Sequence, residues 1–510
     1  MHRSLLTAAV VLAMLFAGGC SSGKGSGAGS TSQSTDTTAR SGETSTTSGP
    51  PRPTGPVADV SHEITGRTAA FMGAATTVNL ERAGYVEHEY VAAGTATSYK
   101  ATTALSRDGR WKFAPATKAA YRTRVLVRRP ANAADSSGTV VVEWLNVSGG
   151  LDADPDWASF HEELLRRGDT WVGVSAQLIG VVGGPVLVSV PIAAAKDIAG
   201  KGLKAIDAAR YGSLEHPGDG YSFDIFTQVA RAMRAGGAAT GGATPQRILA
   251  AGESQSAFAL VTYYNGVQPL TRAFDGFFVH SRGAVGLPLV TGRRSADIAG
   301  AIAGAPTIFR TDQTAPVLDV QTESDVVGVL NSIAARQPDT DKFRLWEVPG
   351  TAHADAHLIG PIAAQLDCSV PINNGPMHVV VKAALHALET WVQSGTLPPR
   401  APRIETTAGA APKIRRNPDG IALGGIRTPP VDVPTAVLSG APGPNPSLIC
   451  LLLGSTQPLP AARLAQLYPS RAEYTQRYDA DADKTIHSGF ALADDRDALL
   501  AFAQPSRIQP

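Results

Sequence analysis

The sequence predicts an α/β protein with a mostly parallel central sheet that helices cover on both faces. Apolar runs such as 139–145 and 170–175 have the continuous hydrophobicity of strands buried on both sides. These runs alternate with amphipathic stretches such as 157–167, and this alternation favours strand–helix–strand units with parallel strands. The 510 residues are 43% hydrophobic, which is sufficient for a large core.

The expected elements begin near residue 57. Expected strands cover 84–91, 121–128, 139–145, 170–175, 248–251, 274–280, 316–321 and 344–348. Expected helices cover 157–167, 221–234, 377–392, 461–478 and 494–503. The stretch 177–220 is too long for a tight loop, so we expect a cap-like insertion there. We divide the folded chain into a body over 57–395 and a C-terminal extension over 396–510 that packs on it. Within the extension, the Pro-rich stretch 396–447 is expected to be irregular.

The N-terminus predicts an export signal over residues 1–19. A short basic start is followed by the apolar run 5–16 and by Ala17-Gly18-Gly19-Cys20, which resembles the lipobox of bacterial lipoproteins. This resemblance implies cleavage before Cys20 and attachment of fatty acids such as palmitate. The protein would then be anchored on the extracytoplasmic face of the cell membrane. An ordinary signal peptide cleaved nearby is the alternative. The apolar run is too short for a permanent transmembrane helix.

A flexible tether is expected over residues 20–56. This segment consists mainly of Ser, Thr, Gly and Pro and has almost no large apolar residue. Such a composition buries too little surface to offset the entropy lost on ordering. We therefore expect it to link the membrane anchor to the folded body.

The charge balance argues against a nucleic-acid partner. The formal net charge is +1, and charged residues make up 17% of the chain. No Cys or Cys/His spacing suggests zinc, so we expect neither a metal nor a cofactor. The oligomeric state is left open.

The stretch 247–265 (RILAAGESQSAFALVTYYN) carries the main chemical signal. An apolar run turns sharply at Gly-Glu-Ser-Gln-Ser, with Ser254 at the centre, and continues as a helical segment. Strand, tight turn with a central serine, and helix are what a nucleophile elbow needs. The turn exposes the Ser254 hydroxyl and aims the first helical N–H groups at an oxyanion. The usual pattern is G-x-S-x-G. Here Ser256 holds the last place and is small enough for strand and helix to approach closely.

Two side chains that follow Ser254 suit acyl transfer. Asp325 and His353 each come just after an expected strand, so both should project at the carboxyl edge of the sheet beside the serine. Ser254 would be the nucleophile, His353 the general base, and Asp325 the acid that orients the base. Glu323, two residues before Asp325, is an alternative acid.

These residues and the stretches around them resemble the α/β-hydrolase superfamily. More narrowly, the chain resembles exported bacterial proteins that carry an α/β-hydrolase domain. The supporting stretches are VVVEWLNVSGG, HPGDGYSFDIF, AGESQSAF, VQTESDVV and VPGTAHAD. The chain order Ser, Asp, His is the one found in this fold. The resemblance runs from about residue 56 to the end and implies the α/β-hydrolase fold and a Ser254–Asp325–His353 triad.

An oxyanion hole should accompany this triad. One donor is expected to be the N–H of Gln255. The other is expected from the loop after the strand ending at residue 145, with Val147 or Ser148 as candidates. Asn146 occupies the place where the superfamily often has His, which leaves the second donor open.

The cysteines add one structural expectation. If Cys20 carries lipid, Cys368 and Cys450 remain to pair with each other outside the cytoplasm, and their bond would staple the extension to the body. Two buried free thiols are the alternative.

The sequence therefore predicts a lipid-anchored, extracytoplasmic serine hydrolase. The expected activity is carboxylic-ester hydrolysis through an acyl-enzyme on Ser254, with a small-molecule or lipid ester as substrate. An acyltransferase or amidase would use the same triad. A non-catalytic binding lipoprotein on a hydrolase fold is a further alternative. Acyl length and leaving group are not determined by the sequence.

Overall fold

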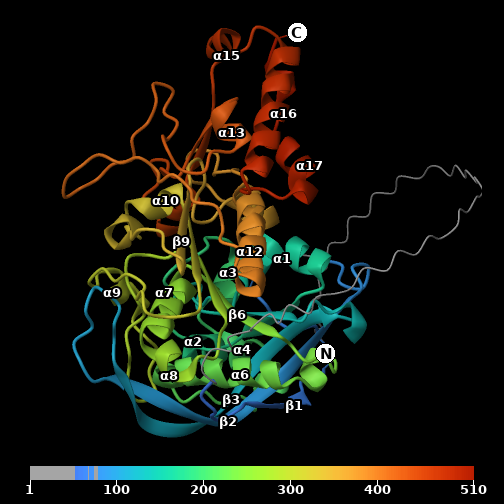
Figure 1. Cartoon of the computed structure of the whole chain (residues 1–510), viewed down its shortest axis with the longest axis vertical. Coiled ribbons are helices and arrows are strands. Elements are labelled where there is room, and N and C mark those ends of the chain that lie inside the picture. The colour runs from blue at the N-terminus through green and yellow to red at the C-terminus, as the bar shows by residue number, and fades with distance from the viewer. Residues whose placement is uncertain (1–51, 67, 74–77, 510) are drawn as a thin grey trace, which may run out of the picture. The chain divides into compact units, whose positions relative to one another are not determined.

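A nine-stranded sheet forms the centre of the computed structural model, which describes residues 52–66, 68–73 and 78–509 (Figure 1). The strand order is β1-β2-β3-β5-β4-β6-β7-β8-β9. The pairs from β5 to β9 are parallel, and those from β1 to β5 are antiparallel. The bounds are β1 (Asp59–Glu63), β2 (Tyr85–Ala101), β3 (Phe113–Pro130), β4 (Thr139–Trp144), β5 (Thr170–Val174), β6 (Arg247–Glu253), β7 (Gly276–His280), β8 (Val317–Thr322) and β9 (Phe343–Val348). The predicted fold class is confirmed.

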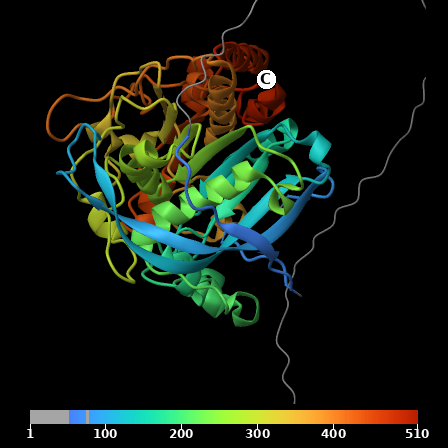
Figure 2. The same cartoon turned by 60° about the horizontal axis from the view of Figure 1, so that its bottom comes forward.

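The antiparallel edge is longer than the sequence indicated. β2 has 17 residues and β3 has 18, and their ladder runs from the pair Tyr85–Pro130 to the pair Ala101–Phe113. Figure 2 shows this hairpin curving along the edge of the sheet away from the C-terminal helices. The expected strands 84–91 and 121–128 were too short. The remaining parts of β2 and β3 are partly exposed and lack an apolar run, so the sequence carries no strand signal there.

Helices cover both faces of the sheet. On one face, α6 (Ser222–Ala235) and α7 (Gln255–Thr262) contribute Phe226, Val229 and Leu260 to the larger core cluster. On the other face, α1 (Pro155–Arg167) and α12 (Met377–Ser394) contribute Phe160, Leu164, Leu385 and Leu388 to a second cluster. Strands β4 to β9 have continuous apolar runs because they are buried between these two layers of helices.

The insertion over 177–220 consists of four short helices. They are α2 (Leu178–Val182), α3 (Ala193–Ile198), α4 (Gly202–Ile206) and α5 (Ala208–Tyr211). The remaining short helices of the body are α8 (Gln268–Thr271), α9 (Ile298–Ile302), α10 (Glu323–Val326) and α11 (Ala356–Ile359).

The extension contains more regular structure than expected. Two elements interrupt the stretch predicted to be irregular, α13 (Pro429–Asp432) and β10 (Ala436–Ser439), which pairs with β11 (Ser455–Pro458). Between these strands lies α14 (Leu448–Leu453). In Figure 1 the C-terminal helices lie near β9, at the end of the sheet opposite β1 to β3. From Arg52 onward, body and extension form a single compact unit.

The single helix predicted over 461–478 was wrong. The structure has α15 (Ala461–Leu467) and α16 (Arg471–His487), and a shorter helix than expected, α17 (Arg496–Leu500), follows. Pro469 disfavours helical backbone at Tyr468, which is extended at φ −132°. The Ser470 side chain then accepts the N–H of Glu473 and caps the new helix.

The predicted signal peptide, Cys20 and residues 20–51 of the predicted tether lie outside the described residues. Within the part of the chain that the structure describes, no helix has the length and apolarity needed to cross a membrane.

Candidate active site

The predicted elbow forms at the carboxyl end of β6. Ser254 caps α7 with φ 58° and ψ −118°, a conformation that non-glycine residues seldom adopt, and its N–H donates to the carbonyl of His280 (2.9 Å). A Cβ added to Gly252 would lie 3.1 Å from Ser256, which is itself fully buried. The close approach of strand and helix therefore requires small residues at positions 252 and 256, and serine meets that requirement at position 256.

The structure brings Ser254, His353 and Asp325 together. Nε2 of His353 lies 2.8 Å from Oγ of Ser254, and Nδ1 of His353 lies 2.7 Å from Oδ1 of Asp325. The other oxygen of Asp325 accepts the N–H and hydroxyl of Thr322, each at 2.7 Å. The main-chain N–H of His353 donates to Oγ of Ser324 (2.7 Å). The imidazole is therefore held from both sides in a geometry that lets Nε2 take the serine proton.

Local charge supports this arrangement. Burial alone would raise the pKa of Asp325, but the charge of His353 and hydrogen bonds from His353 and Thr322 outweigh it, so the pKa is lowered and Asp325 stays ionised. Burial likewise opposes a charged imidazole. The nearby carboxylates of Glu253 and then Asp325 outweigh burial and raise the pKa of His353 to about 9.

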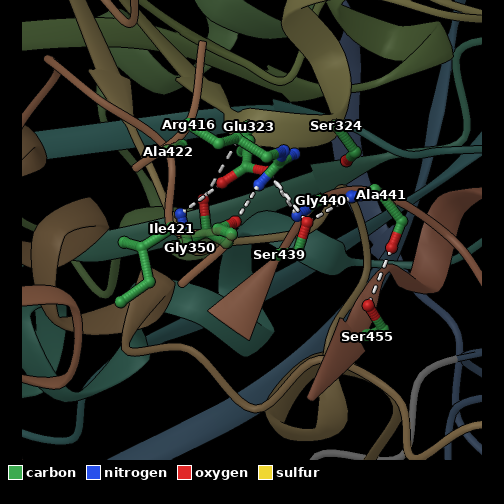
Figure 3. Close-up of polar contacts among 12 residues, drawn as sticks. Glu323, Ser324, Gly350, Arg416, Ile421, Ala422, Ser439, Gly440, Ala441 and Ser455 are labelled. Carbon is green, nitrogen blue, oxygen red and sulfur yellow. Dashed lines mark hydrogen bonds and ion pairs between the residues drawn. The ribbon is translucent and has the colours of Figure 1, made fainter. Parts of the chain in front are cut away.

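Glu323, the alternative acid, has another set of partners. Its carboxylate accepts the N–H of Gly350 (2.7 Å), the N–H of Gly440 and the hydroxyl of Ser439 (both 3.0 Å), and it pairs with the Arg416 guanidinium. Figure 3 shows these groups converging on Glu323. Three of the four belong to the C-terminal extension. Glu323 therefore ties the extension to α10, the short helix that also carries Asp325, and the contact to His353 is made by Asp325.

The two candidate donors for the second oxyanion contact already have partners. The N–H of Val147 donates to Oε1 of Gln255 (3.1 Å), and the N–H of Ser148 donates to Oδ1 of Asn146 (2.8 Å). Gln255 begins α7, so its own N–H has no acceptor within the helix. Either loop N–H would have to exchange its side-chain partner before it could bind an oxyanion.

A mainly apolar cavity of about 250 Å³ opens beside Ser254 and His353. The insertion supplies Val188, Val190, Ala195, Ile198 and Ala199 to its wall. The segment after His353 supplies Leu358, Ile359 and Ile362, and the extension supplies Ile449 and Leu452. Asn146, Ser148 and Glu253 provide polar groups near the serine. The cavity can therefore hold an apolar group next to the nucleophile.

Cys368 and Cys450 form the expected disulfide, which closes a separation of 82 residues. Both cysteines belong to a small buried cluster with Ile449, and Leu358 and Ile359 pack against it. The bond therefore holds α14 against the segment that follows α11, and both segments line the cavity.

Sequence reasoning missed Glu253. Its Oε1 lies 3.2 Å from Nε2 of His353, the nitrogen that also faces Ser254. The available signal was an acidic residue at the end of a buried strand, directly before the serine. His280 ends the neighbouring strand, and its Nδ1 lies 2.9 Å from Oδ1 of Asp156.

Comparison with protein families places this chain in one of them. The α/β-hydrolase domain model matches residues 53–501. No curated protein sequence gave a match. Similar solved structures include an α/β serine hydrolase without lid from Xanthomonas campestris (13% identity, 60% of this chain and 96% of that chain, TM-score 0.29). A second is an α/β serine hydrolase homologue from Coxiella burnetii (14% identity, 46% of this chain and 84% of that chain, TM-score 0.25). A third is an esterase from Rhizomucor miehei (9% identity, 59% of this chain and 86% of that chain, TM-score 0.29).

Proposed function

This chain belongs to the α/β-hydrolase family, and we propose that it hydrolyses carboxylic esters through an acyl-enzyme formed on Ser254. One observation carries the proposal. The hydrogen-bonded chain from Ser254 through His353 to Asp325 has distances of 2.8 and 2.7 Å, at the edge of a cavity that can admit a substrate.

The proposed reaction has two steps. Oγ of Ser254 attacks the ester carbonyl carbon while its proton passes to Nε2 of His353. The tetrahedral intermediate then collapses to the acyl-enzyme, and the leaving alcohol takes that proton. In the second step, water gives a proton to His353 and attacks the acyl carbon. Collapse of this intermediate returns the proton to Ser254 and releases the acid. Asp325 holds the imidazole in the required tautomer and stabilises its charged form. The N–H of Gln255 would be one donor to the oxyanion.

The cavity supports an apolar ester as substrate. Aliphatic side chains form most of its wall, whereas the polar groups are gathered at the serine. Burial of an apolar chain is worth about 0.8 kcal/mol per CH₂, so an acyl or alcohol chain that fills the cavity would be preferred over acetate.

The location of the protein is part of the proposal. The basic start, apolar run and small residues before Cys20 support export and lipid attachment to that cysteine. The ester substrate would then be met at the extracytoplasmic face of the membrane.

A binding role without catalysis is the second candidate. The observation in its favour is that the N–H groups of Val147 and Ser148 are both occupied by side chains. An amidase or an acyltransferase would use the same three residues. The amidase would release an amine in place of the alcohol, and the acyltransferase would pass the acyl group to an acceptor other than water.

The test uses the folded part of the chain, residues 52–510, with a fluorophosphonate probe and a series of aryl esters from acetate to laurate. Labelling and turnover are expected in the wild type and absent in Ser254→Ala, because the nucleophile is removed. A well-folded wild type that shows neither would overturn the hydrolase proposal and favour the binding role. Turnover of amides, or acyl transfer to added alcohols, would identify the related enzyme classes.

A further inference from the structure

A second carboxylate meets the catalytic imidazole from the substrate side. Asp325 contacts Nδ1 of His353, whereas Oε1 of Glu253 lies 3.2 Å from Nε2. Nε2 is the nitrogen that exchanges protons with Ser254 in the proposed reaction. Glu253, Ser254 and His353 all line the same cavity. Glu253 is therefore placed where the charge on His353 changes during turnover.

The position of Glu253 is well defined. It is the last residue of β6 and is 4% exposed. The side-chain amide of Asn146 donates to its main-chain carbonyl (3.1 Å) and to its carboxylate Oε2 (3.3 Å). This leaves Oε1 directed at His353. The side chain thus joins the loop after β4 to the imidazole.

We propose that Glu253 is a positioning residue that acts through His353, and that its ionised carboxylate sets the pH above which His353 can take the proton of Ser254. This inference rests on the proposed function. When Nε2 carries a proton, the Glu253 carboxylate can accept it in a hydrogen bond. The contact therefore stabilises the imidazolium that forms after Ser254 attacks. The same contact holds the proton on the resting enzyme at low pH.

Four titratable groups act on Glu253. Burial raises its pKa to about 7, the charges of His353 and His280 lower it, and Asp156 and Asp325 raise it. The pKa of His353 is lowered by burial and raised by the carboxylates of Glu253 and Asp325. Since Asp325 remains when Glu253 is changed, the contribution of Glu253 can be measured separately.

The expected shift has a definite sign. Reaction of Ser254 needs neutral His353, so its rate should rise with pH as the imidazolium loses its proton. Replacing Glu253 by Gln removes a negative charge, lowers the pKa of His353 and moves the midpoint of this rise to lower pH. An opposite charge at this distance shifts a pKa by about one to three units, so the midpoint should fall by about that amount. The rate on the high-pH plateau should fall by about tenfold, since the imidazolium loses one charged partner.

The test measures the rate of fluorophosphonate labelling from pH 5 to pH 10. Glu253→Gln keeps the size of the side chain and an acceptor for Asn146. Asp319→Asn is the matched control. Asp319 is also a buried carboxyl whose pKa is raised by burial, to about 6, but its contacts are Gln321 on its own strand, β8, and Arg282 in the segment after β7. Its midpoint should stay at the wild-type value.

The outcomes separate the two proposals. The role of Glu253 is supported if the pH midpoint of labelling is lower in Glu253→Gln than in the wild type and is unchanged in Asp319→Asn. Equal midpoints in wild type and Glu253→Gln overturn it and leave the serine hydrolase intact. An unlabelled wild type overturns the hydrolase proposal itself. If Glu253→Gln does not fold, Glu253→Asp provides the second variant, because it keeps the charge and withdraws it from Nε2. Its midpoint should also fall, and an unchanged value would contradict the inference.

Discussion

Replacing Glu323 by Gln should destabilise the protein far more than it slows the reaction. Oε2 of Glu323 accepts one N–H, from Gly350, whereas Oε1 receives three donors. The new amide would therefore place its nitrogen at the Oε2 position, where it faces the Gly350 N–H. A buried N–H without an acceptor costs about 1–3 kcal/mol. The effects of Glu323→Gln on stability and on kcat can be compared directly with those of Asp325→Asn, two residues away.

The ion pair with Arg416 adds to this cost. Its guanidinium side chain is 26% exposed, so the lost charge contributes near the lower end of the range for charged hydrogen bonds, about 1.5 kcal/mol. Together the two terms predict a loss of about 3 kcal/mol in the free energy of unfolding. Urea unfolding followed by circular dichroism would measure it.

The kinetic comparison decides which carboxylate serves His353. Asp325→Asn should lower kcat by roughly 10⁴-fold, since the imidazole loses the group that holds its tautomer. Glu323→Gln should keep most of its kcat at a temperature where the variant is folded. The reasoning is refuted if Glu323→Gln loses kcat to the level of Ser254→Ala at unchanged stability while Asp325→Asn remains active.

Two further predictions concern the wall of the cavity. The double variant Cys368→Ser, Cys450→Ser should lose about 4 kcal/mol of stability in urea unfolding, because the bond closes a loop of 82 residues in the unfolded chain. Unchanged unfolding in urea would show that the bond adds nothing. Leu452→Trp should lower kcat/KM for laurate esters at least tenfold more than for acetate, because the larger ring fills space that a long chain needs. An equal loss for both esters would place the long chain elsewhere.

Local patterns in the sequence were sufficient for the sheet and the elbow. Continuous apolar runs predicted the buried parallel strands, because burial on both faces removes the need for alternation. The Gly-Glu-Ser-Gln-Ser turn predicted the elbow, since β6 and α7 approach closely where Gly252 meets Ser256 and small residues fit there. Because Asp325 and His353 each follow an expected strand, the sequence placed them at the sheet edge beside Ser254, and the structure brings the three within hydrogen-bonding distance.

Tertiary packing decided what these patterns left open. Glu323 and Asp325 lie on one short helix, and their partners differ because donors from the distant extension, at Arg416 and Ser439, surround Glu323. The contact of Glu253 with His353 joins residues 100 positions apart, so no local periodicity could indicate it. Such contacts depend on how loops from separate strands meet at the sheet edge. The sequence by itself determined which strands and which serine would form the site, and the packing of loops and extension determined which charged groups reach the imidazole.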